Sequence, residues 1–230
     1  MNDYFKSIIE LFYPRICNGC GTPLLNGESV ICLKCHIKLP RTEFVLKPEN
    51  PIEKLFWGRL QIQHASSFLY FRKTGLSQRL IHQLKYKGRF EVGYHLGYLY
   101  GQEIKSAILE IKPDFITTVP LHSQKIKERG YNQSDEIAKG FSNATNIPFV
   151  PNLIKRIEAT ETQTKKRRYT RWENIENKFI LDSSIEIHNK HIVLIDDVIT
   201  TGATMEACGK VILENKYTNL SILSICYAIS

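Results

Sequence analysis

The chain has 230 residues, of which 43% are hydrophobic and 23% are charged, and its formal net charge is +8. This composition is typical of a soluble globular protein, and the length fits one α/β domain with a small appendage. No segment reaches the roughly 18 uninterrupted apolar residues of a membrane span, and the N-terminus lacks the apolar core of a signal peptide. We therefore expect a cytoplasmic protein without a membrane span. Its positive charge favours polyanionic ligands, either nucleic acid or phosphorylated metabolites.

Residues 1–45 are expected to form a short amphipathic helix followed by a zinc ribbon. Two C-x₂-C pairs, separated by eleven residues, are formed by Cys17 and Cys20 and by Cys32 and Cys35. Two such knuckles supply the tetrahedral set of four sulfurs that Zn²⁺ prefers. Disulfides or redox thiols are the alternatives, but a redox motif needs a single C-x-x-C beside a βαβ unit. The pattern predicts a structural Zn²⁺ that supplies folding free energy.

Residues 46–60 contain Pro48 and Pro51 and are expected to be a linker. From residue 61 to residue 230, predicted strands and helices alternate. Strands are expected at 65–71, 114–119, 149–154, 192–195 and 220–229, and helices at 76–87, 94–109, 133–144 and from about 203 onward. This alternation predicts a mostly parallel sheet with helices on both faces and a ligand at the carboxyl ends of the strands.

The segment 191–204 is the most informative part of the chain. Four apolar residues predict a buried strand, and Asp196 and Asp197 stand where that strand is expected to end. A turn rich in Thr and Gly, residues 200–204, leads into a helix. Such a turn is a phosphate cradle, because backbone N–H groups and the helix dipole favour an anion. No lysine follows Gly202, which excludes a Walker-type loop, and the carboxylates suit vicinal hydroxyls and a hydrated Mg²⁺.

This motif resembles the phosphoribosyl pyrophosphate (PRPP) loop of the type I phosphoribosyltransferases. Three further segments, 81–89, 119–133 and 156–174, extend the resemblance along the chain. Together with the cysteine pairs, they resemble the ComF family of bacterial phosphoribosyltransferase-like proteins, whose members are associated with DNA uptake in natural competence.

The resemblance implies roles for individual residues. Asp196 and Asp197 would bind the ribose hydroxyls, and the Thr/Gly turn would bind the 5′-phosphate. Arg129 and Asn132 could reach the diphosphate, and the basic loop 156–171 corresponds to a lid over the reaction centre. The alternatives for this loop are a solvated basic loop or a basic patch that contacts DNA phosphates. The candidate catalytic residues are Asp196, Asp197 and Arg129, and the candidate PRPP ligands are Asp196, Asp197, Val198, Thr200, Thr201, Gly202, Ala203, Thr204 and Asn132.

Two functions follow from the resemblance. The first is Mg²⁺-dependent transfer of a phosphoribosyl group from PRPP. The second is a non-catalytic adaptor of the competence machinery that binds single-stranded DNA or a partner protein, with a regulatory PRPP site. The acceptor substrate and the oligomeric state cannot be read from the sequence.

Overall fold

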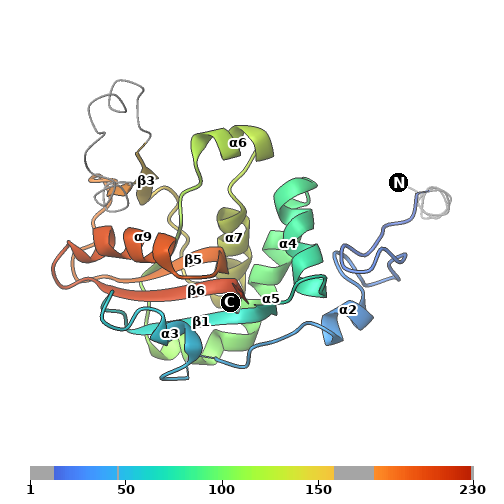
Figure 1. The fold of residues 1–230 in the computed structure, drawn as a ribbon, viewed down its shortest axis with the longest axis horizontal. Helices are drawn as coiled ribbons and strands as arrows, with labels where there is room; N and C mark the ends of the chain where they lie inside the picture. The colour runs from blue at the N-terminus through green and yellow to red at the C-terminus, as the bar shows by residue number, and fades with distance from the viewer. Residues whose placement is uncertain (1–12, 46, 158–178, 229–230) are drawn as a thin grey trace.

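The fold is built on a central sheet of four strands (Figure 1). The structure is a computed structural model that describes residues 13–45, 47–157 and 179–228. In sheet order the strands are β1 (His64–Phe71), β6 (Asn219–Ala228), β5 (His191–Ile199) and β2 (Phe115–Thr118). Each neighbouring pair is parallel, so all four carboxyl ends lie at one edge of the sheet. The expected parallel sheet is confirmed.

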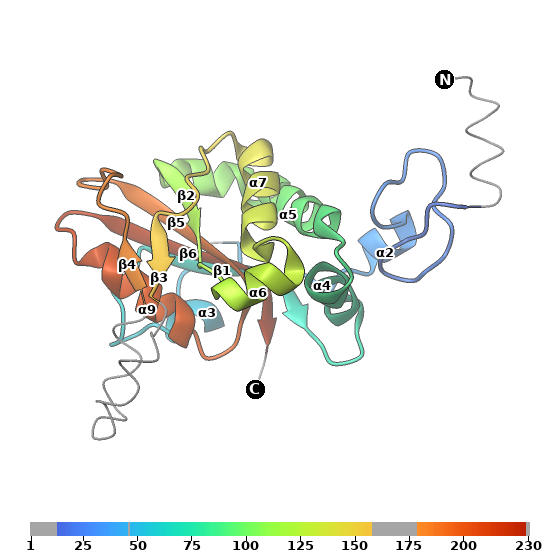
Figure 2. The ribbon, with the colours of Figure 1, turned by 90° about the horizontal axis from the view of Figure 1, so that it is seen from above.

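Different helices cover the two faces of the sheet (Figure 2). One face carries α4 (Leu76–Tyr86), α5 (Phe90–Glu110) and α7 (Gln133–Thr145), and the other carries α9 (Ala203–Leu213) and α3 (Pro51–Lys54). Side chains alternate along β5 because successive residues of a strand point to opposite faces. Val193 and Ile195 belong to the first core cluster, and Ile192 and Leu194 belong to the second. In the described ranges, no helix combines the length and the apolar character needed to span a bilayer.

Glycines bring α5 and α7 close together. A Cβ atom at Gly97 would lie 2.0 Å from the carbonyl oxygen of Ile137, and one at Gly140 would lie 1.9 Å from that of Tyr94. Neither position therefore accepts a larger residue without moving the helices. This packing fixes α7, whose first residues reach the carboxyl edge of the sheet.

Two elements differ from the sequence prediction. The expected strand 149–154 makes a single parallel bridge, between Phe149 and Ile116 of β2. A separate two-stranded antiparallel sheet is formed by β3 (Ile154–Arg156) and β4 (Phe179–Leu181). Pro151 stands in this segment, and proline cannot donate a hydrogen bond to a sheet ladder. A short helix that was not anticipated, α6 (Ser123–Arg129), lies between β2 and α7.

The cysteine-containing unit packs directly on the main domain. Its helix is α2 (Leu33–Ile37), and its buried residues join the same core cluster as those of α4 and α5. The Arg79 side chain donates from Nε to the Gly19 carbonyl at 2.8 Å, and Arg41 pairs with Glu103 of α5 at 2.8 Å. The amphipathic helix expected before this unit lies outside the described residues, as does most of the expected lid.

Residues 47–60 are more than a linker, because they contribute to the core. The side chain of Asn50 caps α3 by accepting from Ile52 N, and its amide donates to the Ala65 carbonyl of β1 at 2.7 Å. Ile52 and Phe56 are fully buried in the second cluster. A domain boundary at residue 61 would therefore separate Ile52 and Phe56 from the core in which they pack.

Candidate functional site

The two adjacent acids lie at the carboxyl edge of the sheet, within β5. The strand continues to Ile199, so both acids lie within the strand, near its carboxyl end, and not beyond it. Consecutive residues of a strand face opposite sides, and the two carboxylates accordingly have different partners. Ser134, near the start of α7, donates its hydroxyl to Asp196 at 2.8 Å. Lys85, in the last turn of α4, bonds to Asp197 at 2.8 Å.

The pKa of Asp196 depends on the charged and polar groups around it. Burial, followed by the neighbouring charge of Asp197, raises the pKa of Asp196 from 3.8 to about 7, whereas Ser134 and Lys85 act in the opposite direction. The Lys85–Asp197 pair is largely enclosed, with side-chain exposures of 21% and 12%. Two neighbouring carboxylates can coexist here because a cation compensates one of them.

The Thr/Gly turn follows β5 and begins α9. Gly202 has φ +75°, in the left-handed region, and is buried, whereas Thr200, Thr201 and Thr204 are exposed. The first N–H groups of a helix have no carbonyl partner within it, so they are available to an anion. Asp196 and residues 198–205 line a hollow of about 50 Å³ at this point. The structure thus brings Asp196 and the expected phosphate turn to one hollow, whereas Asp197 does not line it.

Arg129 and Asn132 are placed differently from each other. Arg129 ends α6, and its guanidinium donates to Gln133 Oε1 at 2.5 Å and lies 5.3 Å from the ring centroid of Tyr86. The side chain of Asn132 caps α7 by accepting from Ser134 N, and its amide donates to the Val119 carbonyl at 3.1 Å. The contacts of Asn132 are therefore those of a helix cap, and they give its expected diphosphate contact no support.

Ser134 and the role of Lys85 were not recognised in the sequence. Lys85 lies in the segment 81–89, where a lysine near a helix end also compensates the helix dipole. Its carboxylate partner is 112 residues away in the chain. Tyr131 adds a further link, because its hydroxyl donates to the Leu84 carbonyl and so ties the segment before α7 to the end of α4.

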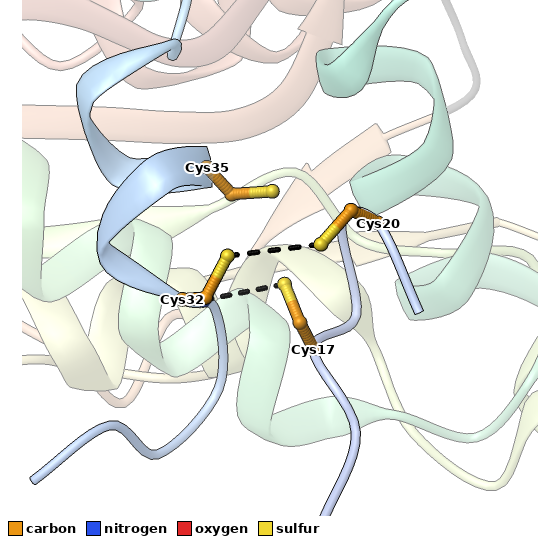
Figure 3. Close-up of side chains that lie close together, drawn as sticks. All are labelled: Cys17, Cys20, Cys32 and Cys35. Atoms are coloured by element: carbon orange, nitrogen blue, oxygen red, sulfur yellow. Dashed lines mark hydrogen bonds between the residues drawn. The ribbon is translucent and has the colours of Figure 1, made fainter. Parts of the chain in front are cut away.

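The four cysteines of the N-terminal unit converge on one point (Figure 3). All four sulfurs lie within 4.8 Å of one another, and those of Cys20 and Cys32 are 3.7 Å apart. A tetrahedron with Zn–S bonds of about 2.3 Å has edges of about 3.8 Å. Cys17 Sγ accepts from the backbone N–H groups of Cys32 and Gly19, at 3.2 and 3.4 Å, as a thiolate ligand would.

The set could therefore hold a metal ion, and its geometry suits Zn²⁺. All six cysteines of the chain are free thiols, and a separation of 3.7 Å is far longer than the roughly 2.05 Å of a disulfide bond. Cys208 and Cys226 are separate from this cluster and are fully buried in the core.

Comparison with known proteins agrees with this architecture. The family model "Phosphoribosyl transferase domain" matches residues 137–228. DNA utilization protein YhgH of Salmonella typhimurium is 32% identical over 227 residues, which cover 95% of this chain and 92% of that protein. Competence protein F of Haemophilus influenzae is 33% identical over 137 residues, covering 58% and 60% of the two chains. Competence protein ComFC of Bacillus subtilis is 24% identical over 213 residues, covering 91% and 76%.

Among solved structures, a hypoxanthine phosphoribosyltransferase from Staphylococcus aureus has a TM-score of 0.39 at 12% identity, covering 59% of this chain and 74% of that one. The family assignment comes from the sequence relatives, and the similarity to YhgH extends over nearly the whole of both chains. With its four-cysteine unit and its phosphoribosyl transferase domain, the chain belongs to the ComF family, together with YhgH and the competence proteins F and ComFC.

Proposed function

We propose that the chain binds PRPP with Mg²⁺ at the carboxyl edge of the sheet and transfers its phosphoribosyl group to a nitrogen acceptor. One observation supports this proposal: Asp196 and a helix-initiating Thr/Gly turn line one hollow, and Asp197 follows Asp196 in β5. The turn suits a phosphate, and the carboxylates suit the two hydroxyls of a ribose, so the site matches both parts of one ligand.

Each side chain has a defined task in this reaction. The turn N–H groups hold the 5′-phosphate, and the carboxylates of Asp196 and Asp197 accept hydrogen bonds from the ribose hydroxyls. Lys85 limits the repulsion between the two acids. Carboxylate and diphosphate oxygens form the hard donor set that Mg²⁺ prefers, and the bound ion would draw charge from the departing diphosphate. No protein nucleophile is needed, because positioning and charge stabilisation lower the barrier.

Arg129, at the end of α6, is the candidate residue for binding the diphosphate. Its guanidinium is partly exposed above Tyr86, and a planar fork of donors suits phosphate oxygens. The resemblance assigns the basic loop 156–171 to a lid that excludes water, which would otherwise hydrolyse a reactive ribosyl centre. Of this loop, the structure describes only Arg156 and Ile157.

The four-cysteine unit would bind one structural Zn²⁺ through Cys17, Cys20, Cys32 and Cys35. Three of the four cysteines are buried, so a metal here would be part of the fold. We infer a cytoplasmic location, where thiols stay reduced and available to the metal.

The experiment that tests the proposed function measures binding and turnover on one preparation. PRPP with Mg²⁺ is titrated calorimetrically, and release of pyrophosphate is followed with a panel of nitrogen bases. The double variant Asp196→Asn/Asp197→Asn should lose binding, whereas Asp114→Asn should keep it. Asp114 is a suitable control because its carboxylate bonds Lys190 and His191 at the opposite edge of the sheet. Unchanged PRPP affinity in the folded double variant would contradict the assignment.

A second function is favoured by the names of the relatives, which refer to DNA utilization and competence, and by the net charge of +8. In this case the chain is a non-catalytic adaptor that binds single-stranded DNA or a partner protein, and PRPP is a regulator. The same preparation distinguishes the two: PRPP binding without pyrophosphate release, together with DNA affinity that falls steeply with salt, supports the adaptor.

A further inference from the structure

The guanidinium of Arg59 connects the segment 51–60 to the phosphate turn. Its Nη1 donates to the Leu55 carbonyl at 2.9 Å and to the Thr201 carbonyl at 3.1 Å. Its Nη2 donates to the carboxylate of Glu206. Thr201 belongs to the turn and Glu206 to the first turn of α9, so one side chain holds the turn and the helix that it begins.

Phe56 makes a second contact behind the same turn. It is fully buried, and a Cβ atom built on Gly202 would lie 3.1 Å from two atoms of its ring. Neither Phe56 nor Arg59 lines the hollow beside Asp196. The segment 51–60 therefore supports the turn from behind and leaves its other side to the ligand.

Charge gives Arg59 a further effect. The carboxylate of Glu206 lies one helical turn from the position of an incoming phosphate, where an uncompensated negative charge would repel the ligand. Arg59 binds one oxygen of this carboxylate, and Lys210 Nζ lies 3.2 Å from the other oxygen. The Thr201 carbonyl is also a negative dipole end, and it accepts a hydrogen bond from Arg59.

We propose that Arg59 is a positioning residue for phosphate binding: it fixes the Thr201 carbonyl and the Glu206 carboxylate so that the N–H groups of residues 200–204 face the ligand. This inference rests on the proposed function in one respect, that the ligand carries a phosphate. The side chain of Arg59 is 39% exposed, and an exposed ion pair contributes little to folding stability. Its effect is therefore on the turn, and only slightly on the whole fold.

The test compares Arg59→Gln and Arg59→Lys with Arg41→Gln as the matched control. Arg41 forms a similarly exposed pair with Glu103 on the α5 side of the sheet, away from α9. Affinity for ribose 5-phosphate is measured by calorimetry, and hydrogen exchange of residues 200–206 is measured without ligand. Arg59→Gln should weaken binding roughly tenfold, which corresponds to about 1.4 kcal/mol, the scale of one hydrogen bond to a charged group. Arg59→Lys keeps the charge but not the fork and should be intermediate.

The pattern of exchange separates positioning from a general structural role. Faster exchange confined to residues 200–206, with an unchanged urea midpoint, supports the proposal. Unchanged ribose 5-phosphate affinity and exchange in Arg59→Gln overturn it, as does a uniform rise in exchange over the whole domain. If the wild-type protein binds neither ribose 5-phosphate nor PRPP, the proposed function fails, and the exchange of the turn alone decides the role of Arg59.

Discussion

Replacing Gly202 by alanine perturbs the phosphate turn in two measurable ways. The residue has φ +75°, a conformation that costs an L-residue about 1–2 kcal/mol. The new Cβ atom would also lie 3.1 Å from two ring atoms of Phe56. Carbon atoms prefer separations of about 3.5–4.0 Å, so the ring must move by a few tenths of an ångström. Phe56 is fully buried, and overpacking such a site costs about 1 kcal/mol or more.

Gly130→Ala is the matched control for this substitution. Gly130 has φ +79°, and no atom lies within 4 Å of the position of its Cβ, so alanine there meets only the backbone cost. In urea denaturation, Gly130→Ala should lower the free energy of unfolding by about 1–2 kcal/mol, and Gly202→Ala by about 2–3 kcal/mol. Gly202→Ala should also reduce affinity for ribose 5-phosphate. Equal losses of stability in the two variants, with phosphate affinity retained in Gly202→Ala, would refute the close support of the turn by Phe56.

Four further outcomes are expected. Asp196→Asn with Asp197→Asn should cost about 3 kcal/mol or more of PRPP binding, measured by calorimetry, because hydrogen bonds to charged groups are lost. Because the pKa of Asp196 is raised from 3.8 to about 7, the native state binds a proton that the unfolded state releases. The free energy of unfolding should therefore fall as pH rises between these values, and Asp196→Asn should flatten the slope of stability against pH. Elemental analysis should find one Zn²⁺ per wild-type chain and a large loss in Cys17→Ser. A fragment of residues 61–230 should lose affinity for ribose 5-phosphate, whereas residues 41–230 should retain it.

The main features of the fold could be predicted because each depends on local sequence. The buried strand before Asp196, the turn and the following helix are adjacent in the chain, and the spacing of the cysteines is itself the zinc signal. The end of β5 was placed too early, because two consecutive carboxylates resemble a strand terminus. Inside the structure the strand continues to Ile199, since the partners of the acids are supplied by Ser134 and Lys85.

The partners themselves could not be predicted, because they are distant in sequence. Lys85 and Asp197 are separated by 112 residues, and Arg59 and Thr201 by 142. A single sequence contains no information on which of many lysines or arginines meets a given acid. Only the fold brings α4 and the segment before β1 to the edge where β5 ends.

The prediction of a linker at residues 46–60 overlooked a helix signal that the sequence does contain. Pro48 and Pro51 suggested an irregular connection. However, Asn50 followed by Pro51 is also a favourable start for a helix, because asparagine caps the first turn and proline suits its first position. The structure shows this arrangement in α3, where Asn50 accepts from the backbone N–H groups of Ile52 and Glu53.

This short helix changes how the two parts of the chain are related. Leaving the four-cysteine unit, the chain pairs with β1 through the Thr42 N–H and the Phe68 carbonyl, then crosses to the opposite face (Figure 1). There Phe56 and Arg59 reach the phosphate turn. The N-terminal segment thus passes around the β1 edge and connects the metal-binding unit to the rear of the ligand site. A domain boundary at residue 61 would cut this connection, so phosphate binding should depend on residues that precede it.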